Sequence, residues 1–216
     1  MRNISRRDFM RTGAALSVAG FATLLGGCGN TEGASGNAGA SAGSAAKAES
    51  AASGSGTGSK TLVAFYSAQG HTRAAAQAIA DELGADIFEI VPREPYTDDD
   101  LDWTQDGSRV NKEHDDESLR DIPLVASAPS NFADYDTVLL GYPIWWAVSA
   151  WPTDRFAKDN DFTGKKVITF CTSTSSGLGQ SGKLLAEAAG TGDWQDGKRF
   201  SSSADEGEIR DWARSL

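Results

Sequence analysis

The stretch from Ser67 to Thr72 has the residue types that bind a phosphate group. It has the sequence Ser-Ala-Gln-Gly-His-Thr, and a helical pattern follows it directly. Gly70 permits a tight turn, and the first N–H groups of a helix are unpaired donors at the positive end of its dipole. Together with the hydroxyls of Ser67 and Thr72, these donors would hold a phosphate without any lysine. The alternative is that Thr72 only caps the helix. The Walker A pattern is absent, so we do not expect triphosphate hydrolysis.

A second stretch, residues 141–147, offers flat aromatic surfaces. It has the sequence Gly-Tyr-Pro-Ile-Trp-Trp-Ala and follows an apolar run. Two adjacent tryptophans on a loop are difficult to bury together, and aromatic planes at the edge of a site stack on a flat ring. We therefore expect a ring-binding loop here, with one of the two tryptophans packing on a helix.

A third stretch, residues 172–179, is a turn rich in hydroxyl groups and glycine. Its backbone N–H groups are suited to the edge of a polar heterocycle. Residues 177–182 also match the Gly-x-Gly-x-x-Gly fingerprint of dinucleotide sites. We do not interpret the match in that way, because a hydroxyl-rich run separates it from the preceding strand and no acidic residue ends a following strand.

Each of these stretches follows a predicted strand. Apolar runs predict buried strands over residues 61–66, 86–91, 137–142 and 166–171, with a weaker fifth strand near 198–200. Helical patterns cover residues 75–83, 152–158, 183–189 and 209–216. Strands that alternate with helices predict a parallel sheet with right-handed crossovers. Ligands of such sheets bind beyond the carboxyl ends of the strands, so the three stretches should meet at one edge.

Taken together, residues 67–72, Tyr-Pro-Ile-Trp-Trp at 142–146, and Phe-Cys-Thr-Ser at 170–173 with Ser176 and Gly177 resemble the flavodoxin-like family. The resemblance is closest to bacterial flavodoxins of the Pro-Ile-Trp-Trp type and covers residues 60–216. It implies an α/β fold, a flavodoxin-like doubly wound five-stranded parallel sheet in three layers, α/β/α. It also implies FMN as the cofactor.

The resemblance assigns roles to thirteen positions in these stretches. The FMN phosphate would be held by Ser67, Gln69, Gly70, His71 and Thr72. The isoalloxazine ring would be flanked by Pro143, Ile144, Trp145 and Trp146. Its other side would be lined by Thr172, Ser173, Ser175 and Gly177. Many flavodoxins have a Thr where this chain has Gln69.

Residues 1–27 have the pattern of an export signal. Several arginines precede an uncharged apolar run at 14–25, which is too short to cross a bilayer. Residues 5–10 resemble the twin-arginine export motif, and Leu-Gly-Gly-Cys at 25–28 looks like a lipoprotein cleavage site with Cys28 lipidated. The alternative is an ordinary N-terminal anchor helix. Residues 28–59 are rich in Gly, Ala and Ser, which predicts a flexible tether before a flavodoxin-like domain at 60–216.

The charge of the chain is strongly negative. It has 20 basic and 30 acidic residues; without residues 1–28 the balance becomes 16 − 29 = −13. Such a charge disfavours nucleic acid as a partner and would lower the reduction potential of a bound flavin. With Cys28 acylated, Cys171 has no partner for a disulfide, and we expect it to be a buried residue at a strand end.

Acidic residues concentrate between 94 and 121, in the long connection between the second and third predicted strands. This segment would dock a basic redox partner or simply be solvated. His114 lies among its acids, but no second His or Cys is nearby at ligand spacing, so we expect no metal site. We also expect no Ser-His-Asp triad and no other catalytic residue.

Three functions follow from these patterns. The first is an FMN electron-transfer protein held at the outer face of the cytoplasmic membrane by lipidated Cys28, with a redox protein or a small acceptor as its partner. The second is an FMN-dependent NAD(P)H/quinone reductase, and the third is a flavin-free binding module. The twin-arginine route exports folded proteins, which suits a domain that takes up FMN inside the cell.

Overall fold

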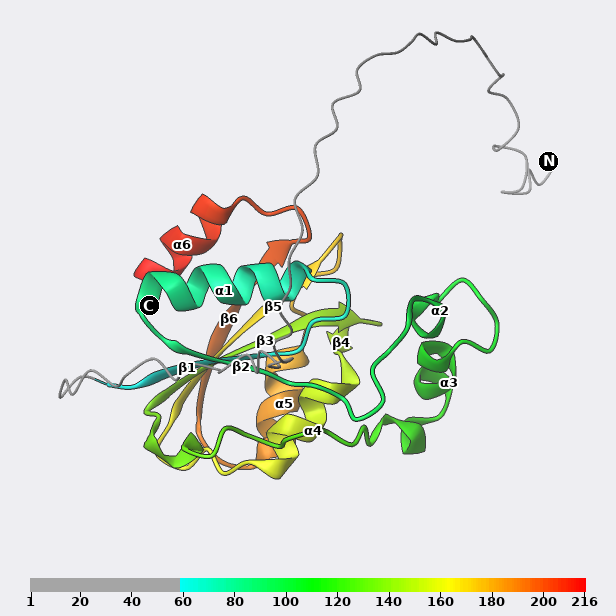
Figure 1. The fold of residues 1–216 in the computed structure, drawn as a ribbon, viewed down its shortest axis with the longest axis horizontal. Coiled ribbons are helices and arrows are strands. Elements are labelled where there is room, and N and C mark those ends of the chain that lie inside the picture. The colour runs from blue at the N-terminus through cyan, green and yellow to red at the C-terminus, as the bar shows by residue number, and fades with distance from the viewer. Residues whose placement is uncertain (1–58) are drawn as a thin grey trace, which may run out of the picture. The chain divides into compact units, whose positions relative to one another are not determined.

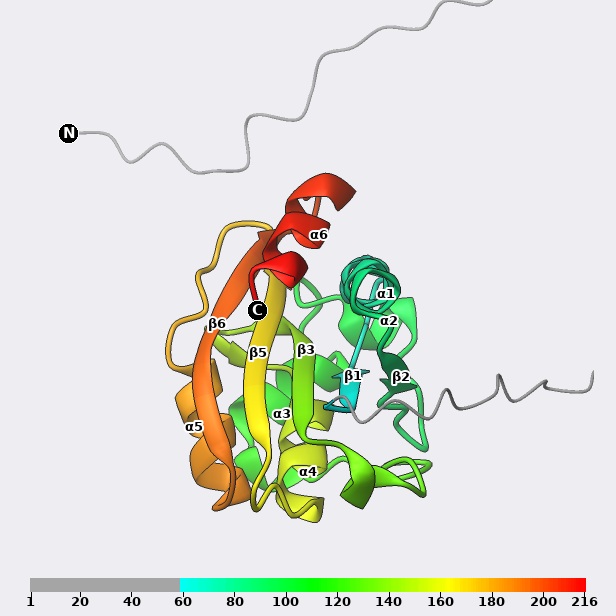
Figure 2. The ribbon, with the colours of Figure 1, turned by 90° about the vertical axis from the view of Figure 1, so that its left-hand side faces the viewer.

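Five parallel strands form the centre of the computed structural model, which describes residues 59–216. They are β1 (Thr61–Phe65), β2 (Asp86–Glu89), β3 (Thr137–Trp145), β5 (Lys166–Ser173) and β6 (Asp193–Ser201). Their order in the sheet is β2-β1-β3-β5-β6 (Figure 2). A short strand, β4 (Val148–Ser149), pairs antiparallel with the end of β3. The order is that of a doubly wound sheet, so the predicted five-stranded parallel sheet is confirmed.

The three central strands are buried on both faces, as their unbroken apolar sequences predict. Val63 of β1 pairs with Leu139 of β3, and Leu139 pairs in turn with Ile168 of β5. All three side chains are buried. This register brings the carboxyl ends of β1, β3 and β5 to the same edge of the sheet.

Helices cover both faces of the sheet (Figures 1 and 2). On one face, α1 (His71–Leu83) packs beside α6 (Glu206–Arg214), over a core that includes Phe170 and Phe200. On the other, α4 (Trp151–Asp159) packs beside α5 (Ser181–Ala189), over a core that includes Tyr142. The predicted three-layer α/β/α architecture is confirmed.

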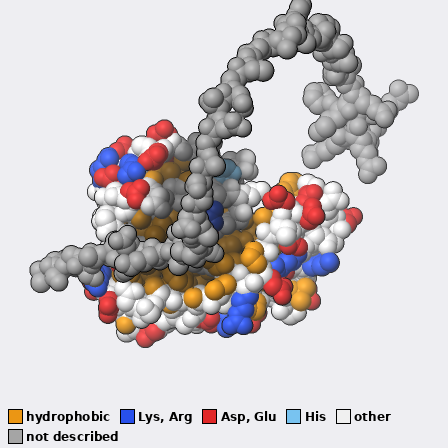
Figure 3. Space-filling model, in the orientation of Figure 1, with side chains coloured by type: hydrophobic (Ala, Val, Ile, Leu, Met, Phe, Trp, Pro, Cys, Tyr) orange, Lys and Arg blue, Asp and Glu red, His pale blue; other side chains and the backbone are white. Residues whose placement is uncertain are grey.

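Ion pairs join the two helices of the first face. Arg214 of α6 donates from Nε to Glu82 of α1 at 2.7 Å, and Arg210 pairs with the same carboxylate at 3.5 Å. Figure 3 shows the basic and acidic side chains intermixed over this part of the surface. The three side chains fasten the C-terminal helix to α1.

The fifth predicted strand is longer than its pattern indicates. β6 runs over nine residues and pairs with β5, with an irregularity in register opposite Ile168–Phe170. A Cβ added to Gly197 would lie 2.2 Å from the carbonyl oxygen of Thr169, so no side chain fits at this position. Because the irregular register breaks the two-residue period, the apolar alternation of β6 is weak.

The connection between β2 and β3 carries the acidic segment. It contains α2 (Asp98–Leu101), α3 (Arg109–Asp115) and short 3-10 helices at Glu117–Arg120 and Phe132–Asp134. In Figure 1, α2 and α3 lie to one side of the sheet, near its carboxyl edge. Within residues 59–216, no helix is both long and apolar enough to cross a membrane.

Candidate functional site

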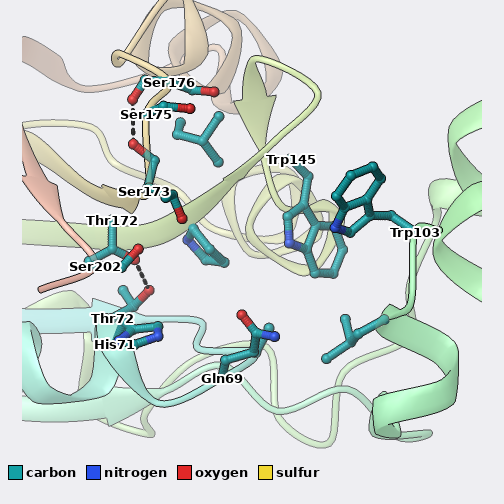
Figure 4. Close-up of a pocket in the computed structure, with 15 residues that line it drawn as sticks. Gln69, His71, Thr72, Trp103, Trp145, Thr172, Ser173, Ser175, Ser176 and Ser202 are labelled. Carbon is teal, nitrogen blue, oxygen red and sulfur yellow. Dashed lines mark hydrogen bonds between the residues drawn. The ribbon is translucent and has the colours of Figure 1, made fainter. Parts of the chain in front are cut away.

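A cavity of about 380 Å³ lies at the carboxyl ends of β1, β3 and β5 (Figure 4). It is lined by nine of the residues that the sequence singled out: Gln69, His71, Thr72, Pro143, Ile144, Trp145, Thr172, Ser173 and Ser175. The three predicted stretches therefore do meet at one edge of the sheet. Ser67, Gly70, Trp146 and Gly177 lie close by in the chain but do not line the cavity.

The loop after β1 is shaped by Ser67 and Gly70. The Ser67 hydroxyl accepts hydrogen bonds from the backbone N–H of Gly70 at 3.1 Å and of Arg73 at 3.2 Å. Gly70 is the N-cap of α1 with φ +89°, in the left-handed region where side chains are strained. Both residues thus hold the loop in shape behind the cavity, and the first turn of α1 presents His71 and Thr72 to it.

Thr72 joins this loop to the one after β5. Its hydroxyl oxygen lies 2.8 Å from that of Thr172, and the two share a hydrogen bond (Figure 4). Both side chains are buried and both line the cavity. The contact therefore fixes the start of α1 against the end of β5.

The loop after β5 is held by Arg199, a residue of β6 that the sequence did not single out. Its guanidinium donates to the hydroxyl of Ser173 at 3.0 Å and to the carbonyl oxygens of Ser173 and Thr174 at 2.9 and 3.0 Å. The Ser173 hydroxyl in turn donates to the carbonyl of Ser176. Ser176, which belongs to the third stretch but was given no role of its own, also lines the cavity, as does Ser202, which the sequence did not single out.

We expected the aromatic stretch at 141–147 to be a loop, but residues 141–145 belong to β3. β3 continues through Pro143, and the chain turns back only after Trp145, where Trp145 pairs with Val148 of β4. The turn is formed by Trp146 (φ +44°) and Ala147 (φ +67°). A two-residue hairpin turn of this kind requires left-handed backbone at both positions, and that conformation costs roughly 1–2 kcal/mol for each side-chain-bearing residue. Pairing of Pro143 with Thr172 of β5 and of Ile144 and Trp145 with β4 keeps this stretch extended.

The two tryptophans have different surroundings. Trp145 lines the cavity and meets Tyr96 and Trp151 edge to face, with ring centroids 5.3 and 5.6 Å apart. Trp146 lies outside the cavity, with its ring stacked 4.3 Å from His114 and 6.2 Å from Trp151. Both tryptophans therefore pack on Trp151 of α4, and Trp146 also packs on His114 of α3, whereas we expected only one of the two to pack on a helix.

The acidic segment contributes directly to the site. Leu101 at the end of α2 and Trp103 just after it both line the cavity, and Figure 4 shows Trp103 on the same side as Trp145. Trp103 is 71% exposed. The sequence interpretations of this segment, a docking surface or a solvated face, missed this role; a large aromatic residue within a run of acids was the available signal.

A buried carboxylate fastens the segment to the domain. Glu113 of α3 accepts from the Tyr96 hydroxyl at 2.6 Å and from Arg109 Nε at 2.7 Å. The Arg109 guanidinium also lies 4.0 Å from the centre of the Tyr96 ring. Burial, followed by the hydrogen bond to Glu113, raises the pKa of Tyr96, so its hydroxyl remains a donor at neutral pH.

Cys171 is a buried free thiol, as predicted, but it is not at the strand end, because β5 continues to Ser173. Burial raises the pKa of Cys171 to about 12, with a small opposing effect from Arg199. The thiol is therefore protonated at neutral pH and is a poor nucleophile.

A sequence profile of the flavodoxins matches residues 60–216 of the chain. The chain belongs to the flavodoxin family. Two solved structures share its fold. One is a candidate flavoprotein from Bacteroides eggerthii (34% identity, TM-score 0.66), and the other is one from Bacteroides uniformis (35% identity, TM-score 0.67). The first comparison covers 74% of this chain and 98% of the other, and the second covers 73% and 99%.

A third flavodoxin-like structure is more distant. It is a flavoprotein from Lactobacillus acidophilus in complex with FMN, 22% identical to this chain, with a TM-score of 0.54. The comparison covers 72% of this chain and 99% of the other. No curated protein matches the chain.

Proposed function

We propose that this flavodoxin binds FMN in the cavity at the carboxyl edge of the sheet and acts in electron transfer. One observation carries the proposal: the first turn of α1, rich in hydrogen-bond donors, opens into the same cavity as the indole of Trp145. A phosphate and a flat ring are the two parts of FMN that such a cavity suits. The FMN complex of the Lactobacillus acidophilus flavoprotein, which has the same fold, supports it.

The phosphate end of the cavity suits an anion held by dipoles. The described residues that line it include no Lys, Arg, Asp or Glu. The phosphate would be held by backbone N–H groups at the start of α1 and by the side chains of Gln69, His71 and Thr72. Unpaired N–H groups at the positive end of a helix favour such an anion without a basic side chain.

The ring end of the cavity has an aromatic wall and a hydroxyl-rich wall. Trp145 and Trp103 supply indole surfaces, and Ser173 and Ser175 supply polar groups for the edge of the heterocycle. When bound, FMN would supply one- or two-electron transfer, and the protein would supply orientation and electrostatics. The negative charge of the chain would lower the reduction potential, which suits an electron donor.

A second candidate function is reduction of a small acceptor by the same flavin. The exposed Trp103 at the mouth of the cavity favours it, because an aromatic surface beside the flavin offers a place for a small ring compound. Two measurements on the FMN-loaded protein distinguish the two functions. A stable one-electron-reduced form during anaerobic reductive titration supports the carrier. In a turnover assay, steady NAD(P)H oxidation with a quinone and no added reductase supports the enzyme.

We also propose that the domain is exported and held at the outer face of the cytoplasmic membrane. The proposal rests on the arginine-rich start of the chain and on Cys28, which lie outside the residues that the structure describes. Labelling of the cells with a fatty acid, followed by isolation of the protein, should show lipid on the native chain and none on Cys28→Ser. Loss of export on replacement of Arg6 and Arg7 by Lys tests the twin-arginine route.

A further inference from the structure

An apolar hollow of about 250 Å³ adjoins the cofactor cavity. It shares four lining residues with that cavity, Leu101, Trp103, Ile144 and Trp145, and adds Val110 and Trp146. All six side chains are apolar. The polar cavity and the apolar hollow therefore meet along one wall, and a molecule in the hollow would lie beside a ring in the cavity.

The hollow is held open by contacts outside it. Trp146 is fixed between the rings of His114 and Trp151. Asn111 donates from its side-chain amide to the backbone carbonyl oxygens of Trp103 and Gln105, at 3.0 and 2.9 Å. These contacts hold the ring of Trp146 and the main chain at Trp103, which both border the hollow.

Two large aromatic side chains at the hollow remain exposed to water. Trp103 is 71% exposed and Trp146 is 41% exposed. Covering apolar surface of this kind is favourable by about 25 cal/mol for each Å² removed from water. A pair of exposed indoles around an apolar hollow is a feature of ligand sites more than of a protein core.

The segment 98–115, which contributes Leu101, Trp103 and Val110 to the hollow, carries seven acidic side chains against two basic ones, Arg109 and Lys112, so it disfavours an anionic ligand. Asp100 and Asp102 belong to the acidic segment that carries Leu101, and hydrogen bonds from Thr97 and Thr104 lower the pKa of the two carboxyls. Both carboxylates are therefore ionised at neutral pH and would repel an anionic group placed in the hollow itself. A neutral compound would not be repelled by these carboxylates.

We propose that the apolar hollow binds a neutral, flat ring compound of the quinone class, beside the flavin. The inference rests on the proposed function, because it places the ligand next to FMN. The volume suits it: an apolar cavity of about 150 Å³ accepts benzene, and this hollow is large enough for two fused rings. The rival occupant is the flavin ring itself, extending from the cavity into the hollow.

The test uses the FMN-loaded protein in its oxidised form and the probe 2,3-dimethyl-1,4-naphthoquinone, whose substituted ring does not add thiols. The methyl NMR signals of Val110 are followed during titration. We expect saturable shifts at Val110 and none at Val125, an exposed valine that lines neither space. The anionic probe 1,4-naphthoquinone-2-sulfonate should bind at least tenfold more weakly. Absence of saturable Val110 shifts, or equal affinity for the two probes, would overturn the proposal.

A filling substitution separates the quinone from the flavin as the occupant. Val110→Phe should weaken binding of the neutral probe at least tenfold and leave the FMN dissociation constant unchanged, whereas Val125→Phe, at an exposed position, should change neither. Thermal unfolding of the FMN-loaded variants checks that the buried substitution at Val110 leaves the domain folded. If Val110→Phe weakens FMN binding to the same extent, the flavin fills the hollow and the proposal is wrong. A chain that takes up no FMN contradicts the proposed function, and the Val110 shifts in the flavin-free protein then test the hollow alone.

Discussion

The hydroxyl oxygens of Thr72 and Thr172 lie 2.8 Å apart, although 100 positions separate the two residues in the chain. One hydroxyl belongs to the first turn of α1 and the other to the end of β5. Both are buried, so neither has water as an alternative partner. This contact aligns the proposed phosphate end of the cavity with the proposed ring end.

Removing one hydroxyl of this pair should cost more than removing both. Thr172→Val leaves the Thr72 hydroxyl buried without its partner, and we expect the free energy of unfolding to fall by about 1–3 kcal/mol. The double variant Thr72→Val/Thr172→Val should lose less than either single variant, because no unpaired hydroxyl remains. Urea unfolding of the three variants checks this, and additive losses would show that the two hydroxyls do not depend on each other.

Gly70→Ala should reduce both stability and FMN affinity. A Cβ at Gly70 meets nothing within 4 Å, so the cost comes from its φ of +89° and should be roughly 1–2 kcal/mol. Any shift of the loop also moves the first N–H groups of α1, so FMN should bind more weakly. The control is Gly84→Ala at the other end of α1, where φ is +59° and the space is equally open.

The two glycine positions differ chiefly in their distance from the cavity, and also in φ. Gly84→Ala should lose stability by a similar amount and bind FMN as the native protein does. Isothermal titration with FMN and thermal unfolding give both quantities. Equal FMN affinity in the two variants would show that the turn at Gly70 does not position the phosphate donors.

Glu113→Ala should loosen the segment that carries Trp103. The substitution leaves the Tyr96 hydroxyl and Arg109 without their partner, and loss of one member of a buried pair costs about 3 kcal/mol. Glu113→Gln keeps an acceptor for Tyr96 and should lose less. Glu117→Ala, at an exposed ion pair with Arg120, should have no measurable effect. Hydrogen exchange over residues 98–115 should increase in Glu113→Ala alone.

Stability should fall as the pH rises from 9 toward 12. Burial raises the pKa of Cys171 from 9.0 to about 12 and that of Tyr142 from 10.0 to about 12. Between these values both groups lose their protons in the unfolded chain but keep them in the folded one. Deprotonation therefore stabilises the unfolded state, and the free energy of unfolding falls. Urea unfolding at pH 8, 9.5 and 11 should show a steeper decline for the native chain than for Cys171→Ala. A stability that rises over this interval would contradict the burial of both groups.

The sheet was predictable from the sequence because its signals are local. The apolar runs of β1, β3 and β5 indicate strands buried on both faces whatever their neighbours are. Gly84 marks the end of α1 in the same way, through its preference for left-handed backbone. The doubly wound, three-layer arrangement then followed from the resemblance to the flavodoxin-like family.

The parts of the site that could not be predicted depend on contacts between distant residues. Arg199 shapes the loop after β5 through hydrogen bonds that span 25 and 26 positions. Trp103 reaches the cavity because Glu113 fastens its segment to the domain. The end of β3 stays extended because it pairs with β4, a partner of only two residues. None of these contacts leaves a periodic pattern in the sequence.

Titration of the flavin-free protein with FMN tests the central claim most directly. The protein is unfolded in guanidinium, freed of any flavin, refolded and then titrated while the flavin fluorescence is followed. The proposed site predicts saturation at one FMN per chain, with the emission quenched because the ring lies against Trp145. Flavin fluorescence that stays equal to that of free FMN throughout the titration would contradict it.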